Sequence, residues 1–132
     1  MAEDHITVVE AWTPAYSRRD LDALLALSCP DIEVARRLRH ERGHDAVRGL
    51  LHRQSFGVEM HPRVRRMFRR GDTVVVDAQL VVRYVDTGEP VAGQEGAAVL
   101  AVRDGWVARY VPYPDLKTAL SDARLSEDDE VR

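Results

Sequence analysis

Three side chains of this sequence are our candidates for acid–base or polarising chemistry on a small molecule: Tyr16, His40 and Tyr110. An imidazole exchanges a proton near neutral pH, and a phenol hydroxyl can donate a hydrogen bond to a substrate oxygen. These residues are far apart in the chain, so they can share one site only if the fold brings them together. The elements that carry them therefore decide whether this chemistry is available.

The histidines at positions 40, 44, 52 and 61 lie in the middle of the chain but lack the spacing of a metal site. His40 and His44 straddle Gly43, so we do not expect them to share a helix face. His44 and His52 are two helical turns apart, and no cysteine or close pair of acids joins them. The sequence also has no glycine-rich phosphate loop. We predict no metal site and no cofactor.

Residues 4–18 are predicted to form a helix, because apolar residues recur three or four positions apart. Trp12 and Tyr16 fall on its apolar face. Pro14 lacks the backbone N–H that an α-helix needs, so it is expected to kink or break the helix near Ala11.

Two shorter helices are predicted after this one. Asp20 can cap the first of them with its carboxylate. A brief strand over residues 32–35 follows, and the polar residues 36–42 are expected to form a loop. The second short helix begins at residues 43–45 and has an apolar side that should be buried.

The rest of the chain has the pattern of a β-meander. Residues 59–70 form a weak strand whose irregular apolar spacing indicates a bulge. Residues 74–85 alternate strictly, residues 86–89 form a hairpin turn, and strands over 91–103 and 106–113 follow. Helices first and a meander afterwards predict an α+β fold, in which the N-terminal helices pack on a curved, mostly antiparallel sheet.

The alternation assigns one face of the meander to a cavity beneath the helices. An aromatic and aliphatic lining with few hydrogen-bonding groups is typical of small-molecule sites. The predicted ligand-binding residues are Trp12, Tyr16, Arg36, Leu80, Tyr84, Gln94, Ala98, Leu100 and Tyr110.

The carboxylates of the meander, Asp77 and Glu95, fall on the opposite face. A slip of one residue in the register would turn Glu95 inward. Without a slip, the sequence favours binding of a small hydrophobic, ring-shaped ligand over proton transfer by a carboxylate. The outward positions of residues 74–85 are only half polar, which suggests a homodimer through the outer face of the sheet.

The composition is that of one globular domain. The chain has 132 residues, of which 45% are hydrophobic and 31% charged. No apolar run approaches the ~18 residues of a membrane span. Cys29 stands alone, so no internal disulfide can form, and we expect it to be a small core residue. These features predict a cytoplasmic protein with no membrane partner.

Eleven arginines lie between residues 36 and 70, although the net charge of the chain is −3. Only Phe56 and Phe68 accompany them as aromatic residues, so nucleic-acid binding is not expected. Acidic residues elsewhere in the chain can pair with these arginines. The alternative is an anionic small ligand that reaches Arg36 or Arg39 at the mouth of the cavity.

Several segments are similar in order and spacing to one known family. They are Trp12-x3-Tyr16-x3-Asp20, Pro30-Asp31-Ile32-Glu33-Val34, Arg42-Gly43-His44-Asp45-Ala46, Gly71-Asp72-Thr73 and Val102-Arg103-Asp104-Gly105-Trp106. Together they resemble the SnoaL-like branch of the NTF2-like cone fold. The resemblance implies a cone-shaped pocket and a homodimer. We assign residues 1–120 to a SnoaL-like (NTF2-like) domain and residues 121–132 to an acidic tail that is expected to fray.

The resemblance does not imply a single activity. Relatives include steroid isomerases, polyketide cyclases, epoxide hydrolases, dehydratases and binding domains that are not enzymes. The steroid-isomerase pattern is not matched, because Trp12, Arg36 and Ala98 occupy the positions of its tyrosine, base and oxyanion aspartate.

Two hypotheses about function therefore remain. One is an enzyme that acts on a small hydrophobic or polyketide-like substrate through Tyr16, His40 or Tyr110. The other is a non-catalytic module for ligand binding, dimerisation or regulation.

Overall fold

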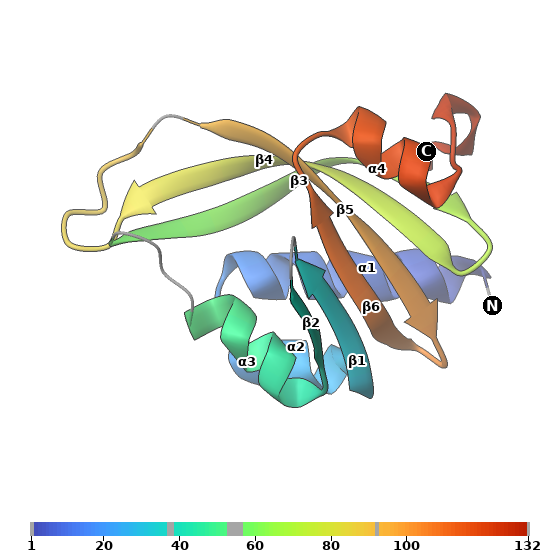
Figure 1. The fold of residues 1–132 in the computed structure, drawn as a ribbon, viewed down its shortest axis with the longest axis horizontal. Coiled ribbons are helices and arrows are strands. Elements are labelled where there is room, and N and C mark those ends of the chain that lie inside the picture. The colour runs from blue at the N-terminus through green and yellow to red at the C-terminus, as the bar shows by residue number, and fades with distance from the viewer. Residues whose placement is uncertain (1, 37–38, 53–56, 92, 132) are drawn as a thin grey trace.

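The computed structural model describes residues 2–36, 39–52, 57–91 and 93–131 and confirms the α+β class (Figure 1). The elements are α1 (Ala2–Ser17), α2 (Leu21–Leu27), β1 (Ser28–Arg36), β2 (Arg39–Arg42), α3 (His44–His52), β3 (Val58–Arg70), β4 (Thr73–Tyr84), β5 (Gln94–Arg103), β6 (Trp106–Tyr113), α4 (Leu116–Ala123) and the 3-10 helix η1 (Glu127–Asp129). The strands form one curved sheet in the order β2-β1-β6-β5-β4-β3. Among the described strands, β1 and β6 pair in parallel and the other neighbours pair antiparallel, so the sheet is mostly antiparallel as predicted.

The first helix differs from the prediction, because α1 continues through Pro14 to Ser17 without the expected break. Proline at position 14 removes the hydrogen bond to the carbonyl of Glu10. Glu10 and Pro14 are both exposed, so water can donate a hydrogen bond to the carbonyl of Glu10. After α1 ends, the carboxylate of Asp20 accepts a hydrogen bond of 3.2 Å from the backbone N–H of Ala23, which confirms the predicted cap of α2. Among the described residues, no helix is both long and apolar enough to cross a membrane.

The segment expected to be a loop between β1 and α3 contains a strand. β2 pairs antiparallel with β1 and forms one edge of the sheet. Its side chains are polar, which is common on edge strands. Glu33 on β1 attracts their charges, with His40 at 3.5 Å and Arg42 at 3.9 Å. Backbone pairing with β1 thus defines a polar strand that hydrophobic alternation cannot reveal.

The meander agrees with the predicted register. Val76 pairs with Ala98 and Leu100 pairs with Tyr110, so the inward positions of β4, β5 and β6 share one face. The expected bulge in β3 is present between Val64 and Arg66. The hairpin is longer than predicted, because β5 begins at Gln94 and residues 85–93 connect it to β4. This connection lies at the far left of Figure 1, beyond the helices.

The main core fills the space between the concave face of the sheet and helices α1, α2 and α3. Trp12, Leu24, Ile32 and Leu100 are its largest fully buried members. Burial of each such side chain stabilises the fold by about 1.5–3 kcal/mol. Cys29 is buried beside this core, as expected from the sequence. These core contacts therefore fix the positions of the helices relative to the concave face of the sheet.

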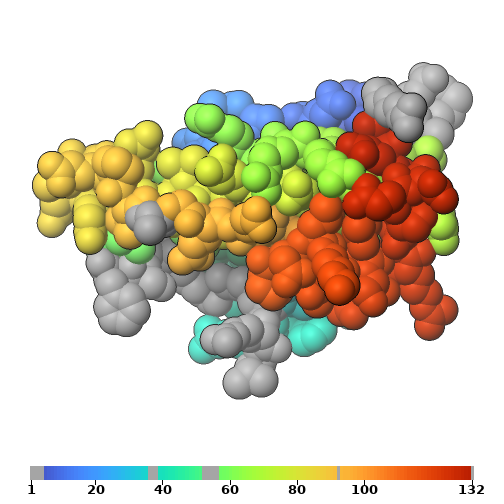
Figure 2. All heavy atoms as spheres, turned by 90° about the horizontal axis from the view of Figure 1, so that it is seen from above, coloured from blue at the N-terminus to red at the C-terminus, as the bar shows by residue number. Residues whose placement is uncertain are grey.

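Residues 121–132 were expected to fray, and in the structure this segment contains the end of α4 and the short helix η1. α4 packs on the convex face of the sheet, where Leu120 and Leu125 join Phe68 in a second buried cluster. Beyond α4, Glu130 pairs with Phe68 in an isolated β-bridge. Figure 2 shows this segment, in red, against the strands on that face.

Ion pairs add to the apolar contacts of this segment. Arg66 on β3 forms ion pairs with Glu127 and, at 2.8 Å, with Glu130. Arg70 forms a further pair at 2.9 Å with Asp129. The acidic tail is therefore the partner of the arginine-rich strand, and it covers part of the face that was predicted to form a homodimer.

Replacement of Leu125 tests whether the C-terminal segment is docked. Leu125→Ala should lower the free energy of unfolding by about 2 kcal/mol, because it leaves a cavity in the cluster around Phe68. Ser121→Ala, at an exposed position of α4, is the control and should change little. Urea unfolding measures both variants. Wild-type stability of Leu125→Ala would show that the segment frays.

Candidate functional site

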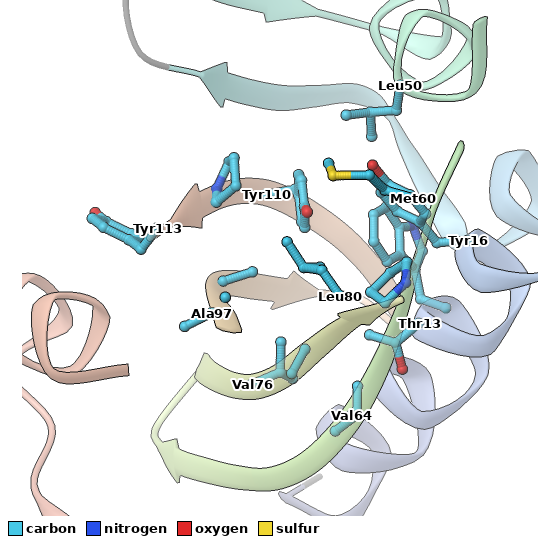
Figure 3. A pocket seen from close by; sticks show the side chains of 16 residues that line it. Thr13, Tyr16, Leu50, Met60, Val64, Val76, Leu80, Ala97, Tyr110 and Tyr113 are labelled. Atoms are coloured by element: carbon cyan, nitrogen blue, oxygen red, sulfur yellow. The ribbon is translucent and has the colours of Figure 1, made fainter. Parts of the chain in front are cut away.

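A cavity of about 150 Å³ lies between α1 and the concave face of the sheet (Figure 3). Its wall is mostly apolar and is contributed by α1, α3 and strands β3 to β6. The lining residues are Trp12, Thr13, Tyr16, Leu50, Met60, Pro62, Val64, Val76, Ala78, Leu80, Gly96, Ala97, Ala98, Tyr110, Pro112 and Tyr113. Such a concave, apolar site with a few polar groups is the usual form of a small-molecule site.

An aromatic cluster forms one side of the cavity. The rings of Trp12 and Tyr110 have centroids 5.1 Å apart, and the ring of Tyr16 meets that of Trp12 edge-on at 5.7 Å. Tyr16 and Tyr110 are also neighbours, with centroids 6.0 Å apart. Offset and edge-on contacts of this kind add to the burial energy and hold the rings in place.

The hydroxyl groups of Tyr16 and Tyr110 share a hydrogen bond. Burial raises the pKa of Tyr16 above its ordinary value, and the charge of Arg19 and the bond from Tyr110 offset only part of this effect. Burial, the proximity of Tyr16 and the hydrogen bond raise the pKa of Tyr110 well above its ordinary value. Both phenols are therefore neutral near pH 7, where they act as hydrogen-bond donors and not as bases.

The tyrosine pair supplies the hydroxyl groups of the wall that a ligand can meet. Two other polar groups of the wall are engaged: the indole N–H of Trp12 donates to Ser28 Oγ at 2.9 Å, and the Thr13 hydroxyl donates to the Val9 carbonyl at 2.9 Å. The hydroxyl groups of Tyr16 and Tyr110 are thus the best placed of these to meet a ligand oxygen.

The structure brings together five of the residues that the sequence predicted for the site. Trp12, Tyr16, Leu80, Ala98 and Tyr110 all line the cavity. Leu100 has the predicted orientation but is fully buried in the core beside it.

Other predicted residues lie elsewhere. The side chain of Tyr84 is 48% exposed, and Gln94 is exposed as well, because β4 and β5 extend beyond the helices at these positions. His40 lies on β2 with a side chain 67% exposed, near Glu33 and outside the cavity lining. Arg36 ends β1, and its side chain is outside the described residues.

The prediction missed the contribution of β3 and α3 to the wall. Met60, Pro62 and Val64 alternate on β3 and face the cavity, while charged residues or His61 lie between them. That alternation was a usable signal, but the proline and the bulge obscured it. Leu50 on α3 was recognised as buried but not as part of the wall.

The two carboxylates of the meander lie on the other side of the sheet, as their parity predicted. Asp77 is buried there with Arg65 at 3.4 Å, and Glu95 is within 3.8 Å of the same guanidinium group. Over the described ranges, no group of at least three His, Cys, Asp or Glu side chains is arranged to hold a metal ion. The cavity therefore offers hydroxyl groups and aromatic faces to a ligand.

Comparison with known families identifies the domain, because the family model described as a SnoaL-like domain matches residues 9–110. The chain belongs to the SnoaL-like family. The match spans most of the cavity wall, including Trp12, Tyr16, Leu80 and Tyr110. Among curated proteins, none matches this SnoaL-like chain.

Solved structures show the same fold. The SnoaL-like chain resembles an NTF2-like protein of unknown function from Burkholderia pseudomallei, with 20% identity, coverage of 89% of this chain and 95% of the other, and a TM-score of 0.73. A putative polyketide cyclase from Xanthomonas campestris has 23% identity, coverage of 91% and 96%, and a TM-score of 0.72. An LEH-like epoxide hydrolase from M. tuberculosis has 21% identity, coverage of 91% and 89%, and a TM-score of 0.71.

At these identities the structural likeness establishes the fold of the SnoaL-like chain and not its reaction. The family and the fold together support a protein that binds or transforms a small molecule. The chemistry of its own cavity must decide between these roles.

The raised pKa values of the tyrosine pair predict a dependence of stability on alkaline pH. In the unfolded chain these phenols ionise near pH 10, whereas in the folded chain they resist ionisation, so stability should fall as pH rises above about 10. The double variant Tyr16→Phe/Tyr110→Phe should show a shallower fall. Urea unfolding across alkaline pH measures it, and equal slopes in both proteins would contradict the assignment.

Proposed function

We propose that this protein binds a small, apolar, ring-shaped ligand that carries an oxygen acceptor such as a carbonyl group. The observation that supports this proposal is the tyrosine pair in an otherwise apolar cavity. The faces of Trp12 and Tyr110 contact the ring of the ligand, and a hydroxyl group of the tyrosine pair donates to its oxygen. A single hydrogen bond in apolar surroundings gives orientation as well as affinity.

The chemistry of the wall favours binding over proton transfer. The described residues that line the cavity include no carboxylate and no imidazole, and Asp77 and Glu95 face the opposite side of the sheet. The tyrosines cannot serve as bases near neutral pH, because their pKa values are raised. A donor can polarise a carbonyl group, but a base is needed to remove a proton beside it.

The names of the structural neighbours include cyclases and an epoxide hydrolase, so turnover is the second candidate function. For this chain it would require a substrate that reacts when the tyrosine pair polarises its oxygen. No described side chain of the wall favours this reading over binding, and we therefore place binding first.

Paired ligands that differ in one oxygen test the proposed function. The wild-type protein should bind cyclohexanone more tightly than methylcyclohexane by about 1 kcal/mol, or roughly fivefold in Kd. Tyr16→Phe/Tyr110→Phe should abolish this preference, because it removes both hydroxyl groups. NMR chemical-shift titration measures the affinities.

Tyr84→Phe is the matched control for this experiment. Tyr84 lies outside the cavity lining, so its variant should keep the preference for the ketone. A wild-type protein that binds neither ligand, or a double variant that still prefers cyclohexanone, would refute the proposed function.

We also propose a homodimer through the part of the convex face that α4 leaves open, around Val81 and Val85. Val85 is 43% exposed just beyond the end of β4, and Val81 is half-buried at an outward position of β4. Sedimentation velocity should give twice the mass of the 14.9 kDa chain. Val81→Asp should shift the protein toward the monomer without loss of folded structure. A wild-type monomer at micromolar concentration would refute this assembly.

A further inference from the structure

We infer that Leu80, which lies on Gly96, sets the size limit of the cavity and restricts its ligand to about one six-membered ring. This inference rests on the proposed function, because it specifies which ligands the same cavity admits. It makes Leu80 and Gly96 a pair that determines specificity, although neither has a functional group that could react.

The two residues are diagonal neighbours on the concave face. Gly96 on β5 pairs with Ala78 on β4, and Leu80 is two residues further along β4. A Cβ atom built at position 96 would lie 3.1 Å from Cδ1 and 3.3 Å from Cγ of Leu80. The side chain of Leu80 therefore packs closely over Gly96 of β5, and a larger residue at position 96 would press against it.

The backbone does not require glycine at this position. Gly96 lies within β5 and is not among the glycines with positive φ, so alanine could adopt its conformation. Glycine within a strand is less favourable for stability than alanine, because it loses more conformational freedom on folding. What glycine provides here is room for Leu80, and the room for Leu80 is what keeps the cavity open.

Leu80 borders the open space of the cavity. Its side chain is half-buried, unlike the buried Val76 and Ala78 on the same strand. Figure 3 shows it among the other lining side chains, near Tyr110. A push from a Cβ atom at position 96 would therefore move Leu80 into the cavity, because the sheet blocks movement in the other direction.

The size of the cavity fixes the class of ligand. An apolar cavity of about 150 Å³ is large enough for a molecule of the size of benzene. We therefore expect it to admit one six-membered ring with a small oxygen substituent and to reject two fused rings. Leu80→Ala removes three carbon atoms from the wall, which is most of the volume of the four carbon atoms that a second fused ring adds.

The experiment uses two ketones that differ by one ring, cyclohexanone and 2-decalone, with NMR titration of wild type and variants. Wild type should bind cyclohexanone and reject 2-decalone. Gly96→Ala should weaken the binding of cyclohexanone by about tenfold or more, because Leu80 then enters the cavity. Its urea midpoint should stay close to that of wild type, because the preference of the strand for alanine offsets the cost of moving Leu80.

Two further variants separate the size limit from a general defect. Leu80→Ala should admit 2-decalone. Leu80→Ala/Gly96→Ala should bind cyclohexanone better than Gly96→Ala does, because the added Cβ atom no longer meets a leucine. Gly93→Ala is the matched control, since a Cβ atom there would make only ordinary contacts of 3.7 Å and 3.9 Å outside the cavity lining.

The outcomes distinguish this inference from the proposed function. If wild type binds cyclohexanone but Gly96→Ala binds it equally well, or if Leu80→Ala still rejects 2-decalone, the size limit is refuted and the proposed function stands. If wild type binds neither ketone, both fail. Should Gly96→Ala not fold, the result with Leu80→Ala decides alone.

Discussion

The indole ring of Trp12 is the contact on which the arrangement of helices and sheet depends. It is fully buried, packs against Tyr110 on β6 and donates its N–H to Ser28 at the start of β1. Ser28 in turn donates to the carbonyl of Leu24 in α2 at 2.6 Å. One side chain thus connects α1, α2 and two strands, and it does so with no unsatisfied polar atom. The cavity can remain open beside it because the helix above is fixed by this contact.

Period-two alternation was sufficient to predict the register of the meander. Leu80 and Ala98 are each two residues from a buried neighbour on their strands, and Tyr110 shares their wall because it pairs with the buried Leu100. Parity shows which face of the sheet a side chain takes, however, and not whether the helices cover that side chain. Tyr84 and Gln94 have the inward parity, yet the hairpin that carries them extends beyond α1 and α3 (Figure 1), so they meet solvent. The length of a strand relative to the helices above it cannot be read from alternation.

The elements that the sequence did not predict carry ion pairs between distant segments. Glu33 of β1 lies near His40 and Arg42 of β2, and Arg66 and Arg70 add ion pairs to the apolar cluster that holds the C-terminal segment. Ion pairs between distant segments leave no periodic pattern in either segment, and an acidic tail by itself has the composition of a disordered one. The separation of charge along the chain was the available signal. Arg65, Arg66 and Arg70 of β3 pair with carboxylates of the same chain, which helps to account for a basic segment in a protein of acidic pI.

Both edges of the sheet are protected against further strand addition. At the β3 edge, Val131 donates a backbone hydrogen bond of 2.8 Å to the Met67 carbonyl, and the bridge at Phe68 occupies the adjoining position. At the opposite edge, β2 is short and carries charged side chains. An open row of backbone donors and acceptors would be a template for aggregation. The last residues of the described chain thus occupy backbone groups of β3 that another chain could otherwise pair with, which disfavours fibre formation.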